Sequence, residues 1–113
     1  MAAKGKLKVG SLDQIRAAAD VTETVEVPVE EWGVAVVVRG LKRGEIKAIY
    51  KAAENDDDPE ERMDVLTLAA AMVSPKLTEE EAETLLKEKG LRPIKTVLGA
   101  IMEASGLTDG FRP

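Results

Sequence analysis

The chain has 113 residues, of which 44% are hydrophobic and 33% are charged, and its formal net charge is −5. This length suits one hydrophobic core, and the composition is ordinary for a globular protein. The absence of cysteine and histidine excludes a disulfide scaffold and a thiol nucleophile, and it removes the commonest general base.

The acidic balance disfavours broad binding to nucleic acid or to anionic membranes. Lys4, Lys6 and Lys8 are not followed by the apolar segment of a secretory signal. We therefore expect a cytoplasmic protein without a membrane or nucleic-acid partner, a metal or a cofactor. The composition divides the chain into a flexible basic arm (1–10), a single domain (11–108) and a short tail (109–113).

The N-terminal part of the domain predicts a short helix. Ser11 can cap it, and apolar residues in Leu12–Ala19 recur at helical spacing. A β-hairpin should follow, because Thr22–Pro28 alternates apolar and polar residues and Gly33–Arg39 is rich in valine. A lone hairpin is marginal in water, so we expect it to rest on helices or on another subunit.

Four main helices should complete the domain. They are predicted at Gly44–Glu54, Pro59–Val73, Thr78–Lys89 and Ile94–Ser105. Thr78 and Glu81 have the spacing of a capping box, and Asp58-Pro59 marks the start of the second of these helices. The predicted fold class is α+β: a mainly helical bundle with an N-terminal β-hairpin and a short N-terminal helix.

The helix at 59–73 is apolar on almost every side in its last two turns, which indicates cover from several directions. Burial within the monomer is the favoured explanation. A homo-oligomer or partner interface is the alternative, since Ala69, Ala70 and Ala71 would let another helix approach closely.

Two further features have both a structural and a functional interpretation. The acidic run Asn55–Asp58 could bind a hard cation as part of a small enzyme or regulator, but a solvated turn explains it better. Trp32, the only tryptophan, could fold back onto the core or act as an exposed anchor for a partner. No catalytic pair can be assembled from the residue types present.

Short motifs occur in a characteristic order. Ser11–Ile15 fits S/T-x-x-Q/E-I, Val25–Gly33 contains V-x-V-P and W-G, and Val36–Leu41 ends in R-G-L. A Leu- and Ala-rich helix then leads to Ser74–Thr78, and the last helix closes on Ser105–Thr108. In this order the pieces resemble the tail assembly chaperones of long-tailed bacteriophages, over most of residues 11–108.

The resemblance implies a non-enzymatic chaperone that binds and solubilises the tape measure protein in the host cytoplasm, and that is absent from the mature virion. It would help to recruit tail tube subunits and could form a homo-oligomer. On this hypothesis the partner-binding residues are Trp32, Val34, Val36, Arg39, Leu66, Met72 and Met102. The alternative is a structural tail, head–tail connector or terminator component that forms a ring.

Overall fold

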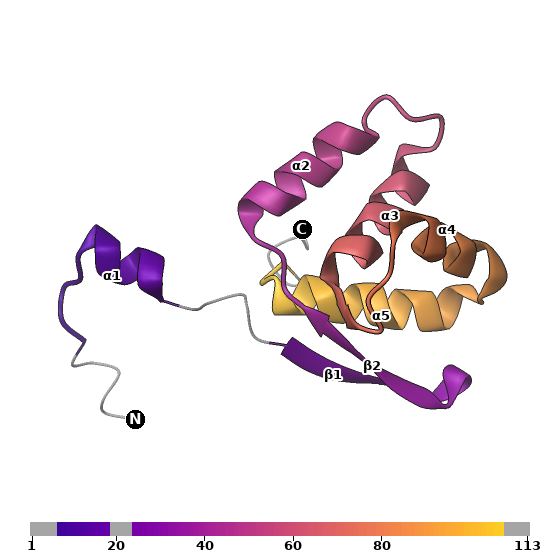
Figure 1. The fold of residues 1–113 in the computed structure, drawn as a ribbon, viewed down its shortest axis with the longest axis horizontal. Coiled ribbons are helices and arrows are strands. Elements are labelled where there is room, and N and C mark those ends of the chain that lie inside the picture. Colours follow the sequence, from indigo (N-terminus) through magenta and orange to yellow (C-terminus); the bar gives the residue numbers. More distant parts are fainter. Residues whose placement is uncertain (1–6, 19–23, 108–113) are drawn as a thin grey trace.

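The computed structural model describes residues 7–18 and 24–107, which combine helices with a three-stranded antiparallel sheet in an α+β fold (Figure 1). The expected α+β class is therefore confirmed, but the sheet contains a third strand beyond the predicted N-terminal hairpin. The helices are α1 (Leu12–Ala17), the 3-10 turn η2 (Glu30–Trp32), α2 (Arg43–Ala53), α3 (Pro59–Ala71), α4 (Glu79–Glu88) and α5 (Leu91–Ala104). The strands are β1 (Thr24–Val29), β2 (Val34–Arg39) and β3 (Met72–Ser74).

Strands β1 and β2 form the predicted hairpin, in a register that pairs Val27 with Val36. Alternation along each strand sends one set of valines inward, where Val29 and Val38 are almost completely buried. Helix α5 packs on both strands from that side. Gly33 closes the hairpin with a φ of 69°, a conformation that favours glycine.

The third strand was not expected. The sequence predicted a helix as far as Val73, which is wrong for its last two residues, because α3 ends at Ala71 and Met72–Ser74 pairs with β2. Ser74 precedes Pro75, and a residue before proline favours extended backbone. This segment also covers an edge of β2 that would otherwise lack backbone partners.

The core lies between the sheet, α5 and α3. Ile94, Val97 and Ile101 of α5 are buried, and so are Val65 and Leu68 of α3. Helix α3 contacts α2, α4 and α5, so most of its apolar surface is covered within the chain. Its cover is incomplete toward α2, where several side chains are only partly buried.

The predicted caps are present. Asp58 Oδ1 accepts a hydrogen bond from the Glu61 backbone N–H at 3.2 Å, with Pro59 in the first helical turn. Thr78 and Glu81 form the reciprocal bonds of a capping box at 2.9 and 3.1 Å. Helix α5 begins three residues before the predicted Ile94, at Leu91.

Several predictions fall outside the described residues. They concern positions 1–6 of the basic arm, Ala19 in the N-terminal helix, the strand start at Thr22 and the tail at 109–113. Helix α1 is described, and its residues are exposed. Figure 1 shows α1 apart from the other helices. In the ranges 7–18 and 24–107, no helix has both the length and the hydrophobicity that a membrane crossing requires.

Candidate partner-binding groove

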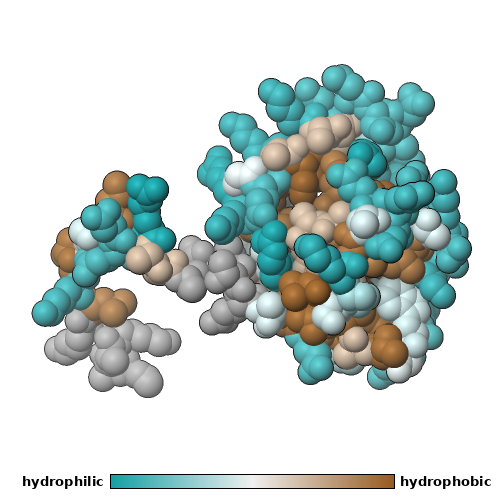
Figure 2. All heavy atoms as spheres, viewed as in Figure 1, coloured by the Kyte–Doolittle hydropathy of each residue, from teal (hydrophilic) through white to brown (hydrophobic). Residues whose placement is uncertain are grey.

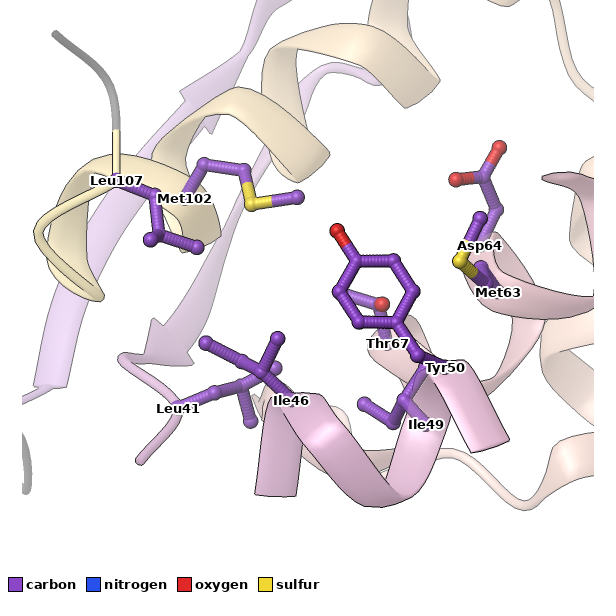
Figure 3. Close-up of a pocket in the computed structure, with 9 residues that line it drawn as sticks. All are labelled: Leu41, Ile46, Ile49, Tyr50, Met63, Asp64, Thr67, Met102 and Leu107. Atoms are coloured by element: carbon purple, nitrogen blue, oxygen red, sulfur yellow. The ribbon is translucent and has the colours of Figure 1, made fainter. Parts of the chain in front are cut away.

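An apolar hollow opens between α2, α3 and the end of α5, and we call it the α2–α3–α5 groove. It encloses about 100 Å³. Its lining comes from three separate parts of the sequence: Leu41, Ile46, Ile49, Tyr50, Met63, Asp64, Thr67, Met102 and Leu107 (Figure 3). Figure 2 shows hydrophobic residues gathered between α2 and α5, with hydrophilic residues around them.

The base of the groove is fixed where β2 passes into α2. The Leu41 backbone N–H donates to Ser105 Oγ at 2.7 Å, and Ser105 Oγ donates to the Ile101 carbonyl at 2.7 Å. Gly40 lies directly against the backbone of Ala104, so that a Cβ at this position would overlap the Ala104 carbonyl. Glycine is therefore required for this close approach.

The α5 side of the groove depends on how that helix ends. Gly106 has a φ of 81°, and its N–H donates to the Glu103 carbonyl at 3.0 Å. The Leu107 N–H donates to the Met102 carbonyl at 2.9 Å. These are the two bonds of a Schellman motif, which brings the residue after the glycine next to the last turn. The motif thus places Leu107 and Met102 together in the groove.

An ion pair ties α2 to the end of β2. Arg39 Nη2 lies 2.7 Å from Glu45 Oε2, and Arg39 Nη1 lies 3.1 Å from Glu45 Oε1. Glu45 Oε1 also accepts the Lys42 backbone N–H at 2.8 Å. The hydrogen bonds from Arg39, aided by that from Lys42 and opposed by burial, lower the pKa of Glu45 to about 2. The pair stays charged at neutral pH and fixes the first turn of α2.

Helix α2 forms the outer wall of the groove. Ile46 and Ile49 are partly buried, whereas Tyr50 is 49% exposed. Figure 3 shows the Tyr50 ring lying across the hollow, with the Met102 side chain pointing toward it. Methionine adapts to irregular apolar surfaces, so Met63 and Met102 suit a site that accepts more than one shape.

Asp64 is the only carboxylate among the described lining residues. Burial raises its pKa, and the nearby carboxylates of Glu60, Asp58 and Glu61 raise it further. This end of the groove therefore carries excess negative charge beside an apolar surface. A ligand with an apolar face and a basic residue beside it would match both properties.

The volume and lining define what the groove can hold. Pockets for small organic ligands enclose about 300–1,000 Å³, so this hollow is too small to hold such a ligand entirely. It suits apolar side chains projecting from a helix that lies across it. Among the described residues, no group of three or more acidic side chains is arranged to hold a metal ion.

The structure separates the residues that the sequence analysis selected as partner contacts. Met102 lies in the groove, and Leu66 lies in a second, shallower hollow between α2 and α3 that shares Ile49. Val34 is 59% exposed at the hairpin end, whereas Val36 and Met72 are buried in the core. Core packing leaves no surface for a partner at these last two positions, so we omit them from the site.

The other two selected residues have structural contacts. Trp32 is partly buried and packs against the core, which favours the interpretation that it folds back. Arg39 is committed to Glu45 and also donates to the Gly40 carbonyl at 3.0 Å. Neither side chain is presented freely to a partner.

The acidic run before α3 has a local structural role. Asp56 Oδ1 accepts the Asp58 backbone N–H at 3.0 Å, and Asp58 caps α3. Carboxylates used in this way stabilise a turn and the start of a helix. These contacts agree with the interpretation of Asn55–Asp58 as a solvated turn.

The sequence did not predict the groove, although it predicted the three helices that form its walls. Ile46, Ile49 and Tyr50 recur at helical spacing within the predicted helix Gly44–Glu54, and all three line the groove. The usable signal was an amphipathic helix containing an exposed aromatic residue, together with methionines on two other helices. Nothing in the local pattern indicated that these three segments would meet.

Searches against protein-family models, curated proteins and solved structures found no match to this chain. The groove is therefore defined by its geometry alone. The resemblance to tail assembly chaperones remains a prediction from the sequence motifs.

Proposed function

We propose that this protein is a non-enzymatic tail assembly chaperone of a long-tailed bacteriophage, and that it binds helical segments of the tape measure protein. The observation that carries the proposal is the order of sequence motifs from Ser11 to Thr108. The α2–α3–α5 groove supports it, because a narrow apolar hollow lined by flexible methionines suits the apolar face of a helix.

The structure suggests how such binding would work. Apolar side chains of a client helix would enter between Tyr50, Met63 and Met102, and a basic residue of the client would lie near Asp64. So small a contact gives low affinity for each copy. Many copies along one long client would together hold it in solution and would still be released readily.

The proposal also includes where the protein acts and what it does during tail assembly. The chaperone would act in the host cytoplasm, would help to recruit tail tube subunits and would be absent from the finished virion. Each of these points rests on the sequence resemblance.

A tagged chain, purified from cells that produce the complete phage, tests the function directly. We expect mass spectrometry to find one very long, helix-rich phage protein with many copies of the bait for each client. A Tyr50→Ser variant should recover much less of it, whereas Leu91→Ser, which changes an exposed leucine at the other end of α5, should behave like the parent.

The opposite result is equally specific. Recovery of portal, terminator or tube protein at a fixed stoichiometry, without a long client, would support a structural component of the tail. Light scattering would then show a ring of constant size.

A further inference from the structure

The described part of the N-terminal segment carries exposed apolar side chains. Leu12 and Ile15 of α1 are 67% and 66% exposed, and Leu7 and Val9 before them are more exposed still. Hydrophobic residues of α1 are visible at the surface in Figure 2. An isolated helix of six residues is unstable in water even with a good cap. Helix α1 therefore requires a surface to pack against.

The residues of α1 are arranged for docking. Leu12 and Ile15 lie three positions apart, so they project from the same side of the helix, and Arg16 lies next to Leu12 on that side. Ala17 lies on the opposite side. The apolar pair with a flanking cation matches the α2–α3–α5 groove, which combines an apolar lining with Asp64.

The N-terminal segment and the rest of the chain carry opposite net charges. Residues 1–18 contain Lys4, Lys6, Lys8 and Arg16 and a single acidic residue, Asp13, although the whole chain has a net charge of −5. The rest of the chain is therefore strongly acidic. Asp64 lines the groove, and the carboxylates of Glu60, Asp58 and Glu61 are close enough to raise its pKa. A basic segment would be attracted to this acidic end.

The chain connection brings α1 within reach of the groove. Thr24, at the start of β1, pairs with Arg39, and Arg39 is only two residues from Leu41 in the groove lining. Six residue steps separate Ala18 from Thr24, and that length of chain can span up to about 20 Å. The helix can therefore reach the groove of its own chain.

The expected affinity indicates whether α1 docks in the groove of its own chain or in that of a second copy. Two apolar side chains and one ion pair bury far less surface than a stable dimer requires, so contact between separate molecules would be no tighter than millimolar. A short tether supplies a local concentration in the millimolar range. Docking within one chain is therefore favoured, and it is weak enough to be reversed.

We propose that α1 docks in the α2–α3–α5 groove of its own chain, with Leu12 and Ile15 in the apolar hollow and Arg16 beside Asp64. The N-terminal segment is then a reversible cover of the groove. This contact does not depend on the identity of any client. Only its displacement by the tape measure protein rests on the proposed function.

The absence of cysteine allows a direct test. A nitroxide attached at Ala17→Cys, on the side of α1 away from Leu12, broadens the nuclear magnetic resonance signals of residues near it. We expect Tyr50, Met63 and Met102 to lose more than half of their signal intensity, and Leu91 to be unaffected. Tenfold dilution should not change this result, because the contact is within one chain.

Two variants of the labelled chain provide the controls. The double substitution Leu12→Ser and Ile15→Ser should restore the signals of the groove, whereas Leu91→Ser should leave the broadening unchanged. Retention of the broadening in the double variant would contradict the proposed anchors. An absence of broadening at the groove in the parent would overturn the proposal.

An experiment on mixed chains distinguishes docking within one chain from docking on a second copy. Nitroxide-labelled chains without isotope are mixed with isotope-labelled chains without nitroxide, and we expect no broadening. Broadening that appears only in this mixture would overturn docking within one chain in favour of exchange between copies. Displacement is tested separately, by adding a tape measure fragment to the chain that carries both the nitroxide and the isotope. If the broadening at the groove then persists, the result counts against this client and not against the docking of α1.

Discussion

Helices α2 and α5 are both amphipathic, yet the protein covers them very differently. Helix α5 lies between the sheet and α3, and its residues Ile94, Val97 and Ile101 are buried. Helix α2 packs mainly on α3, and only Ala53 is buried in it. Figure 1 shows α2 standing apart from the sheet, whereas α5 crosses the sheet.

The difference shows that an apolar helix face does not by itself identify a core. On α5 that face is covered by strands from a distant part of the chain, and it stabilises the fold. On α2 the corresponding face is only partly covered and lines the groove, so that it remains available to another helix. We infer that the buried face of α5 contributes more to stability than the groove-lining face of α2 does.

The comparison predicts unequal effects of the same substitution. Ile101→Ala should lower the free energy of unfolding by about 2–5 kcal/mol, because it leaves a cavity in a closed core. Ile49→Ala should lower it by only about 1 kcal/mol, because that side chain is already partly hydrated. Urea denaturation at neutral pH measures both values. Equal losses would mean that the α2 side is packed as tightly as the core.

The junction between the two regions gives a second test. Gly40→Ala should lower the free energy of unfolding by about 1–3 kcal/mol, because its Cβ would overlap the Ala104 backbone. Gly44→Ala in α2 is the matched control, since its Cβ would meet no atom within 4 Å. It should raise the free energy of unfolding by about 0.5 kcal/mol through helix propensity. A similar loss in both variants would show that close approach is not the reason for Gly40.

The smallest effect concerns the ion pair that holds α2. Glu45→Gln should lower the free energy of unfolding by about 1 kcal/mol near neutral pH, since the pair is bidentate but partly exposed. Glu45 has a folded-state pKa of about 2, below its ordinary value of 4.5. Its stabilisation is therefore present above 4.5 and is lost as pH falls toward 2. Melting curves over that range should show the parent and the variant converge.

Glu83→Gln is the control for this pH dependence. Glu83 Oε2 lies 3.9 Å from Lys87 Nζ in an exposed i,i+4 pair, and such a pair contributes little to stability. Its melting temperature should follow that of the parent at every pH. A difference between the parent and Glu45→Gln that does not change with pH would contradict a role for the charge of Glu45.

Local signals were sufficient to predict much of the fold. The caps at Asp58 and Thr78 and the valine-rich hairpin depend on a few neighbouring residues, so the sequence reveals them directly. Strand β3 could not be predicted in this way. It forms because Met72–Ser74 meets the edge of β2, more than thirty residues earlier in the chain.

The candidate site was less predictable for the same reason. Periodicity indicates which residues share a helix face, but it cannot show whether another element covers that face. Val36 and Met72 were therefore chosen as partner contacts although both are buried, and Tyr50 was not chosen although it lies across the groove. Met102 was selected, but its place beside Leu107 depends on the Schellman motif at Gly106.

The most direct test of the groove measures binding and stability on the same variant. We would titrate a soluble tape measure fragment into the parent, into Tyr50→Ala and into the control Leu91→Ala, and record the three melting temperatures. Tyr50→Ala should weaken binding at least about tenfold while its melting temperature stays close to that of the parent. Unchanged affinity in Tyr50→Ala would contradict the assignment of the α2–α3–α5 groove as the binding surface.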